Sequence, residues 1–288
     1  MPDTPKLVQD DPWLTPHQPA IERRMKRFAD ELAGIRSGSG SLAAYATAHK
    51  SAGIHYQSAA NQWMIREWAP GAKSVSLIGD FNFWNREANP LAPTRDGMWQ
   101  LRLPADALQH GQRVKLHIVG ANGSRRDRIP ACIRRAVQDA ATHDYSGQIW
   151  SPAKAYVWEN NFDPSVITAP LIYETHVGMA GEEPRVHSYR EFAEKTLPRI
   201  VAGGYNTIQI MAIQEHPYYG SFGYHVSSFF APCSRFGTPE DLKFLIDAAH
   251  GHGLAVLLDV VHSHAVKNTA EGLNDFDGSE NQYFHKGP

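Results

Sequence analysis

A carboxylate and two imidazoles follow an apolar stretch near the end of this chain. Residues 255–258 are Ala-Val-Leu-Leu, and Asp259, His262 and His264 come soon after them. Enzymes built on an α/β barrel carry groups of this kind where buried strands end, because the active face lies there. Such groups could bind a metal ion, or they could hold the hydroxyl groups of a sugar.

Two earlier apolar stretches also end in an acidic residue and a histidine. The pairs are Glu174 with His176 and Glu215 with His216. In metal-assisted hydrolysis the histidines and carboxylates would be ligands, whereas in glycosyl transfer carboxylates act as acid and nucleophile. A third alternative is that residues such as Glu174, His216 and His262 only cap strands and bind the backbone.

The loop after the second stretch favours sugar chemistry. Residues 215–225 read Glu-His-Pro-Tyr-Tyr-Gly-Ser-Phe-Gly-Tyr-His, which is dense in tyrosine and glycine. Glycine lets a backbone approach a ligand, and tyrosine offers a flat ring with a hydrogen-bonding tip. A metal hydrolase has no need of such a loop.

Alternating strands and helices must position these groups. We predict strands over residues 171–173, 207–213 and 255–261, with helices between them. The second helix has a clear start, because Thr238 can cap it, a proline follows and Asp241 can complete a capping box. Near-continuous apolar strands separated by helices indicate a parallel sheet that helices cover.

The first strand helps to choose between two kinds of parallel sheet. No glycine-rich phosphate loop follows it, which argues against a nucleotide-binding fold and for a (β/α)8 TIM barrel. A whole barrel takes about 250 residues. From Leu171 to Pro288 there is room for about three strands, so we expect an incomplete barrel.

The upstream part of the chain has a different pattern. Short alternating apolar stretches over residues from about 60 to 155 predict an all-β sandwich of roughly 100 residues. Residues 152–170 are aperiodic and are predicted to be a linker. Residues 1–16 are predicted to be an arm, and apolar residues at helical spacing from Gln18 onward predict an amphipathic helix.

Composition excludes several classes of protein. The net charge of −2 shows no excess of positive charge of the kind that binds nucleic acid or an anionic membrane. The two cysteines, Cys132 and Cys233, have no metal or redox spacing, so we expect free thiols in a reducing compartment. Without an apolar signal core or a run of about 18 apolar residues, the chain is expected to be a cytoplasmic monomer with no nucleic-acid or membrane partner.

Five stretches of the second half resemble one family closely. They are residues 173–179 (Tyr-Glu-Thr-His-Val-Gly-Met), 204–216, 222–225 (Phe-Gly-Tyr-His), 234–242 and 259–265 (Asp-Val-Val-His-Ser-His-Ala). In these stretches the chain resembles the 1,4-α-glucan (glycogen/starch) branching enzymes of eukaryotes and some bacteria. That family belongs to glycoside hydrolase family 13, the α-amylase superfamily.

The upstream part agrees with this resemblance. Residues 79–84 (Gly-Asp-Phe-Asn-Phe-Trp), 98–99 and 127–131 resemble the β-sandwich carbohydrate-binding module of family 48, and residues 11–14 resemble the helical segment before it. The resemblance implies a multidomain chain. Its expected parts are an N-terminal arm and amphipathic helix (1–50), an isoamylase N-terminal-like β-sandwich (51–157) and the first part of a catalytic TIM barrel (158–288).

The resemblance also implies an activity. Branching enzymes cleave an α-1,4-glucan and transfer the piece to a 6-hydroxyl, which forms α-1,6 branches during glycogen biosynthesis. The implied partner is an α-glucan such as glycogen, amylose or a starch-like polymer, and no cofactor is implied. The family's nucleophile, general acid and third carboxylate come from later barrel strands, so no catalytic residue is expected before Pro288 and the chain alone is expected to be inactive.

The family's motifs assign roles to individual residues of this chain. Tyr224, Asp259 and His264 match substrate-binding positions: the tyrosine lies beside the glucose at the cleavage point, the histidine bonds to it and the aspartate supports the site. Ser263 stands where many amylases have a calcium-ligating asparagine, so no metal is expected. Trp84 and Trp99 are the candidates for stacking on glucan.

Two other functions remain open. The chain could be a non-catalytic glucan-binding protein in which the sandwich holds the polymer. It could also be a metal-dependent hydrolase that uses His262 and His264 as ligands.

Overall fold

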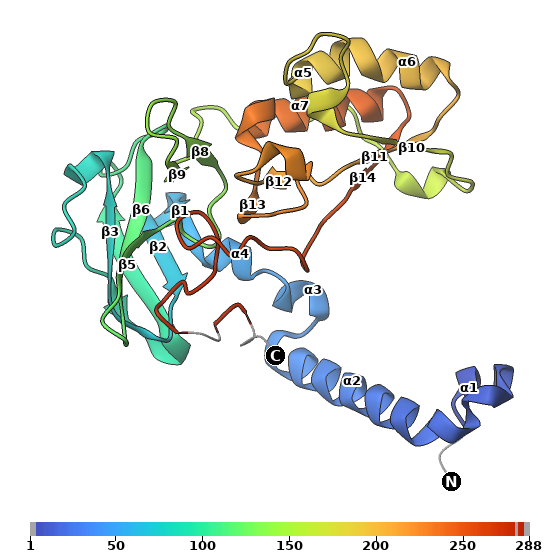
Figure 1. Ribbon diagram of the computed structural model, residues 1–288, viewed down its shortest axis with the longest axis horizontal. Coiled ribbons are helices and arrows are strands. Elements are labelled where there is room, and N and C mark those ends of the chain that lie inside the picture. The colour runs from blue at the N-terminus through green and yellow to red at the C-terminus, as the bar shows by residue number, and fades with distance from the viewer. Residues whose placement is uncertain (1–3, 280–281, 285–288) are drawn as a thin grey trace. The chain divides into compact units, whose positions relative to one another are not determined.

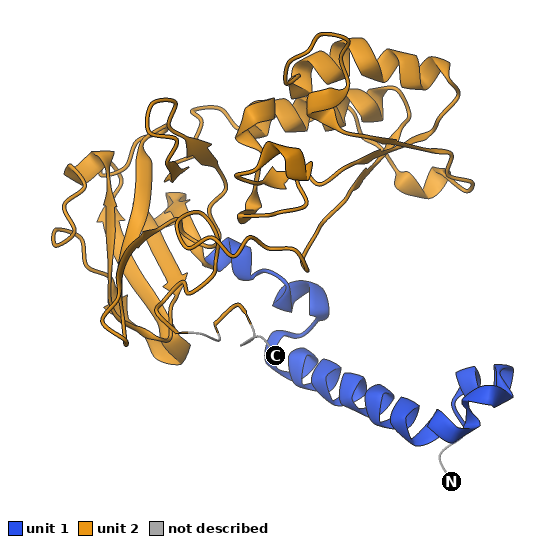
Figure 2. Ribbon diagram, in the orientation of Figure 1, with its two compact units in different colours: residues 1–51 blue, residues 52–288 orange. Residues whose placement is uncertain are grey.

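The computed structural model describes residues 4–279 and 282–284 of the 288-residue chain (Figure 1). The chain divides into two compact units, residues 1–51 and residues 52–288 (Figure 2). The first unit is helical, and the second unit contains every strand of the described residues. No described helix is long and apolar enough to cross a membrane.

The first unit is a series of helices. They are α1 (Lys6–Asp10), the 3-10 helix η1 (Pro12–His17), α2 (Gln18–Ser39), α3 (Leu42–Tyr45) and α4 (Ala48–Ser51). The arm predicted over residues 1–16 contains α1 and η1, and η1 begins after Asp11, which accepts a hydrogen bond from Trp13 N at 3.1 Å. The predicted amphipathic helix is α2, which ends where Gly40 adopts a positive φ of 78°.

The second unit begins with two antiparallel sheets that form the sandwich. One sheet has the order β1-β2-β5-β4, and the other has the order β3-β6-β9-β8 with β7 paired to β6. The strands are β1 (Gly53–Gln57), β2 (Gln62–Trp68), β3 (Ala72–Gly79), β4 (Ala92–Pro93), β5 (Met98–Pro104), β6 (Arg113–Gly120), β7 (Arg125–Arg128), β8 (Ala136–Gln138) and β9 (Tyr145–Gln148). Alternate residues of these strands, among them Ile65, Leu77 and Leu116, fill the core between the sheets.

The remainder of the second unit contains a parallel sheet. Its strands are β10 (Ile172–Thr175), β11 (Thr207–Ile210) and β14 (Ala255–Leu258), paired in that order. Thr175, Ile210 and Leu258 are in register, so the three strands end at one level. The strand predicted over residues 255–261 was too long, because its neighbour β11 ends at Ile210 and only Asp259 N still bonds to it.

Helices cover one face of this sheet (Figure 1). The first covering helix runs through α5 (Tyr189–Glu191), the π segment η7 (Phe192–Thr196) and α6 (Leu197–Ala202). The wide π turn ends two residues before Pro198, whose missing N–H and bulky ring disrupt a regular α-helix. Leu197 and Ile200 of this helix pack with Ile208 and Ile210 of β11.

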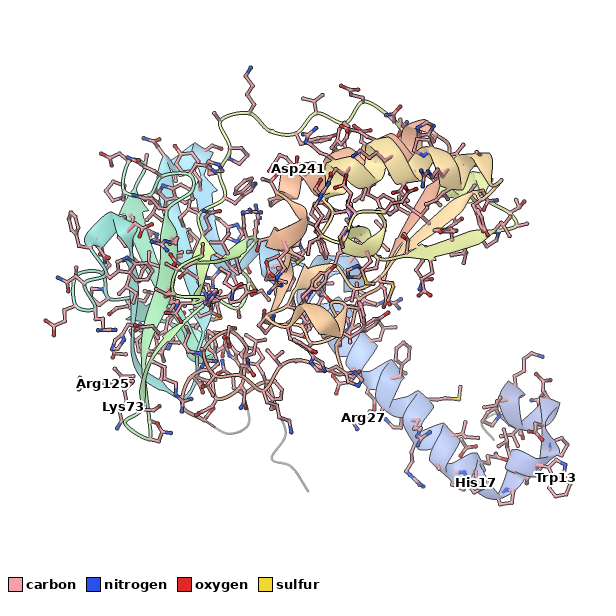
Figure 3. All side chains as sticks on the ribbon, turned by 45° about the horizontal axis from the view of Figure 1, so that its top comes forward. Trp13, His17, Arg27, Lys73, Arg125 and Asp241 are labelled. Atoms are coloured by element: carbon pink, nitrogen blue, oxygen red, sulfur yellow. The ribbon has the colours of Figure 1, made fainter. Side chains whose placement is uncertain are left out.

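The second covering helix is α7 (Pro239–Gly251), which starts with the predicted capping box. Asp241 N donates to Thr238 Oγ1 at 3.1 Å, and Thr238 N donates to Asp241 Oδ2 at 2.9 Å (Figure 3 labels Asp241). The opposite face of the sheet is open, and Ile172 and Leu257, which lie on it, are 43% and 44% exposed.

Short elements connect the sheet strands and the sandwich strands. The hairpin β12 (Gln214–Glu215) and β13 (Ser228–Pro232) follows β11. The 3-10 turns are η2 (Ser58–Ala60), η3 (Asp80–Asn82), η4 (Arg95–Gly97), η5 (Pro164–Val166), η6 (Val177–Met179), η8 (Tyr219–Ser221) and η9 (Ser234–Phe236). The predicted boundary at residues 157 and 158 stays a prediction, because the sandwich and the parallel sheet belong to one unit.

Candidate functional site

Tyr224 and Asp259 meet at the ends of the parallel strands. The Tyr224 hydroxyl donates to Asp259 Oδ2 at 2.8 Å, and Asp259 N donates to Ile210 O at 3.1 Å. The carboxylate accepts the phenolic hydrogen and so raises the pKa of Tyr224 to about 12. Both side chains are half-buried, so each keeps a surface for a ligand.

The turn before Tyr224 explains how its side chain reaches Asp259. Gly223 has a φ of 89°, and a Cβ at this position would lie 1.7 Å from Ala212 O. Only glycine fits a backbone that passes so close to its neighbour. The sequence suggested that glycines of this loop let the backbone approach a ligand. At Gly223 the backbone instead approaches Ala212, so this glycine is needed for the fold of the loop itself.

His262 and His264 are exposed and lie in the segment that follows β14. His264 Nδ1 is 2.8 Å from Ser263 Oγ, and the His262 ring stacks on Phe229 with a centroid distance of 6.1 Å. No hydrogen bond within the described part of the chain joins His264 to Tyr224 or Asp259. The structure thus joins two of the three predicted substrate-binding residues directly and places the third on the adjoining segment.

The first strand end separates its acidic residue from its histidine. Glu174 is exposed, and its Oε1 accepts a hydrogen bond from Gln209 Nε2 at 3.1 Å. His176 is buried against the rings of Tyr219, Phe222 and Phe236. Burial lowers the pKa of His176, so this histidine is held neutral within an aromatic cluster.

The second strand end is buried entirely. Glu215 accepts hydrogen bonds from Ser234 N at 2.7 Å and His216 N at 3.2 Å, and His216 Nδ1 is 2.8 Å from Gln214 O. Neither side chain has any exposed surface. Burial raises the pKa of Glu215 and lowers that of His216. Glu215 and His216 both form hydrogen bonds with backbone groups, as expected for residues that only cap a strand.

The two candidate stacking tryptophans have different environments. Trp99 is only 8% exposed, lies in the sandwich core and donates from Nε1 to Ala69 O at 2.9 Å. This burial contradicts the prediction that Trp99 stacks on glucan, since neither face of its indole can reach a polymer. Trp84 is half-buried, and its Nε1 donates to Asp80 Oδ1 at 3.1 Å.

Sequence reasoning missed two residues near these sites. Gln209, which bonds Glu174, is a polar residue inside the apolar stretch 207–213, and this interruption was the available signal. Phe83, next to Trp84, is 95% exposed at a φ of 55°. No sequence signal predicts that exposure, because a local backbone geometry produces it.

No group of three histidine, cysteine, aspartate or glutamate side chains in the described ranges could hold a metal ion. Cys132 and Cys233 are both free cysteines.

Comparison with known families identifies two domains. Residues 51–133 match carbohydrate-binding module 48 (isoamylase N-terminal domain), and residues 200–287 match the catalytic domain of alpha amylase. The chain is 42% identical to a 1,4-alpha-glucan-branching enzyme of Dictyostelium discoideum over 99% of its own length, and 46% identical to one of Solanum tuberosum over 98%. The chain is thus similar to branching enzymes along nearly its whole length, and its second half matches the catalytic domain of alpha amylase.

The predicted family and fold class are thereby confirmed. The chain spans 42% of the length of the Dictyostelium relative and 34% of the Solanum relative. Among solved structures, it is 18% identical to the Group B Streptococcus pullulanase SAP with a TM-score of 0.63, and the match covers 78% of this chain and 35% of that chain. The catalytic module of the pneumococcal factor SpuA gives 17% identity and a TM-score of 0.61, over 74% of this chain and 37% of the other. These structures share the fold of this chain.

Proposed function

We propose that this chain is the substrate-holding part of a 1,4-α-glucan branching enzyme and that it binds α-glucan. The observation that carries the proposal is 41–46% identity, along nearly the whole chain, to proteins named as branching enzymes. The proposed whole enzyme is a retaining hexosyltransferase that cuts an α-1,4 bond and passes the piece to a 6-hydroxyl. No cofactor is needed for this chemistry.

Tyr224, Asp259 and His264 are proposed to hold one glucose at the strand ends. The bond between Tyr224 and Asp259 holds the tip of the tyrosine ring in place, and the face of the ring can lie against a pyranose. His264 is exposed and can bond to a sugar hydroxyl. A rigid ring beside free polar groups is a favourable arrangement for binding a sugar, because few side chains must lose conformational freedom on binding.

We expect Tyr224→Ala and His264→Ala each to weaken maltoheptaose binding at least about tenfold, or about 1.4 kcal/mol. Isothermal titration of the full chain measures the affinity. Tyr45→Ala and His252→Ala are the matched controls, since both residues are exposed and belong to other parts of the chain. Equal affinity in all four variants would contradict the proposed glucose site.

The carboxylates of the strand ends are poor candidates for bond cleavage. Glu215 has no exposed surface, and Asp259 already accepts the Tyr224 hydroxyl. That this chain alone does not cleave glucan stays a prediction. Loss of iodine colour from amylose incubated with the chain would contradict it.

A second glucan contact is proposed on the sandwich at Trp84. Its indole is oriented by the bond to Asp80, and the neighbouring Phe83 ring is almost fully exposed. Two adjacent aromatic rings at a loop tip suit stacking on successive sugars. The backbone at both residues has a positive φ, 55° and 59°, which costs energy in a residue other than glycine and suggests a functional constraint.

Trp84→Ala is expected to reduce co-sedimentation of the chain with glycogen severalfold while leaving maltoheptaose binding at Tyr224 intact. Trp13→Ala is the control, because Trp13 is 89% exposed and belongs to the first unit (Figure 3). Retention of full glycogen binding by Trp84→Ala would remove the sandwich from the proposal.

A further inference from the structure

The segment after His264 is attached to the sandwich. Residues 265–279 follow β14 in the chain, yet their hydrogen bonds connect them to β7 and to the turn before β3. Leu273 and Phe276 of the segment pack into the sandwich core. We call residues 265–279 the docked segment (red-brown in Figure 1).

Arg128 of β7 is at the centre of this attachment. Its side chain has no exposed surface, and its guanidinium donates to Thr269 O, to Gly272 O at 2.8 Å and to Asn274 O at 2.9 Å. The same group lies over the Phe276 ring, 5.2 Å from the centroid. Three carbonyls of one segment therefore converge on one planar cation, a geometry that lysine cannot reproduce.

The environment of Arg128 makes this cation costly to bury. Burial, followed by the nearby charge of Arg126, lowers the pKa of Arg128 to about 10. A buried cation is tolerated when polar groups surround it. The carbonyls of the docked segment are those groups, so the conformation of the segment and the burial of Arg128 depend on each other.

Asp277 provides a second anchor at the far end of the docked segment. It is fully buried, and its Oδ2 accepts a hydrogen bond from Gly71 N at 2.6 Å. Gly120 of β6 lies so close that a Cβ there would be 2.8 Å from both Asp277 O and Gly278 Cα. The absence of a side chain at position 120 is what allows the segment to lie flat on the sandwich.

The docked segment folds back on its own first residues, which come directly after His264. A Cβ on Gly272 would be 2.7 Å from Val266 Cγ2, and Val266 N donates to Val226 O at 2.9 Å. Val266 is buried, and His264 is two positions before it in the chain. Contacts thus lead from Arg128 through Gly272 to Val266, which is two positions after His264 in the chain.

We propose that Arg128 is a positioning residue, which fixes the docked segment on the sandwich and thereby orders the chain around His264. The sandwich is then part of the scaffold of the strand-end site, in addition to any glucan contact of its own. This inference goes beyond the proposed function, because it concerns the order of the free chain and its test contains no glucan.

Hydrogen exchange of the full chain, followed by mass spectrometry, tests the proposal. In Arg128→Met, amides of residues 262–279 are expected to exchange at least tenfold faster, while those of β3 and β6 keep their protection. Arg128→Lys is expected to be intermediate. Arg125→Met is the control, since Arg125 is exposed on the same strand and its side chain makes no hydrogen bond or ion pair within the described ranges (Figure 3).

A second variant separates positioning from simple loss of a buried charge. Gly120→Ala changes no charge and displaces Asp277 and Gly278, so it should free the same amides. In a chain labelled with ¹⁵N-histidine, both variants should shift and narrow the His264 imidazole signal and leave that of His252 unchanged. An unchanged His264 signal, or protection lost equally throughout the sandwich, would overturn the proposal.

Discussion

Replacing Arg235 with methionine is expected to lower the free energy of unfolding by about 3–5 kcal/mol, because it leaves a buried carboxylate without its cation. Arg235 donates to His216 O at 2.6 Å, to Pro217 O at 2.7 Å and to the Tyr145 hydroxyl at 2.6 Å. Its Nη1 is 3.7 Å from Oε1 of the fully buried Glu215. Methionine fills a similar volume but satisfies none of these groups.

The loss should affect more than one element. Tyr145 belongs to β9 of the sandwich, whereas Glu215 belongs to β12, and Arg235 interacts with both. Three acceptors and one carboxylate would lose a donor or a charge in a site that water cannot enter freely. A buried group left unsatisfied costs more than an exposed pair that is broken, so the effect should be large.

Urea unfolding followed by tryptophan fluorescence measures the change. Arg199→Met is the matched control, because the ion pair of Arg199 with Glu182 has side chains that are 72% and 81% exposed, and its loss should cost less than about 1 kcal/mol. Glu215→Gln combined with Arg235→Met should recover part of the loss, since the uncompensated charge is gone. A cost for Arg235→Met as small as that for Arg199→Met would show that water reaches Glu215.

The elements that the sequence predicted well are those whose own residues carry the pattern. Strands β5 and β6 alternate apolar and polar residues, and α7 begins with Thr238 and Asp241 at capping-box spacing. Strand β7 was not predicted, because its sequence is Arg-Arg-Asp-Arg and only pairing with β6 makes it a strand. A strand that depends on its neighbour has no signal of its own.

The site residues, too, could be predicted only where the local sequence carries the signal. The alternation that predicted β5 already placed Trp99 on one face with Leu101 and Leu103, and that face is the core. The sequence therefore contained a reason against the stacking role. Nothing local distinguishes Glu215 and His216, which are buried, from Asp259, which is not, since their burial depends on packing by residues far along the chain. The periodicity of apolar residues likewise could not predict the hydrogen bond between Tyr224 and Asp259, because these residues are far apart in the chain.

The second large effect concerns the pH dependence of stability. Glu67 of β2 is 2% exposed, and its carboxyl oxygens accept hydrogen bonds from Trp68 N at 3.1 Å and Ala131 N at 2.9 Å. Burial raises the pKa of Glu67 from its usual 4.5 to about 7, because these two bonds only partly offset the loss of water.

The direction of the pH effect follows from this raised pKa. Between pH 4.5 and pH 7 the folded chain keeps a proton on Glu67 that the unfolded chain has released. The free energy of unfolding must therefore fall as pH rises through this window, by about 3 kcal/mol in total, and level off above pH 7. His176 and His216, whose pKa values are lowered by burial, contribute with the opposite sign.

Glu67→Gln isolates the contribution of Glu67, because the histidines are the same in both proteins. The stability of Glu67→Gln relative to the unaltered chain is expected to increase by about 3 kcal/mol between pH 5 and pH 8. Urea unfolding at half-unit pH steps measures this difference, with the exposed Glu87→Gln as the control. If the two proteins instead show parallel pH profiles, Glu67 is ionised in the folded chain throughout this range, and the backbone bonds from Trp68 and Ala131 outweigh its burial.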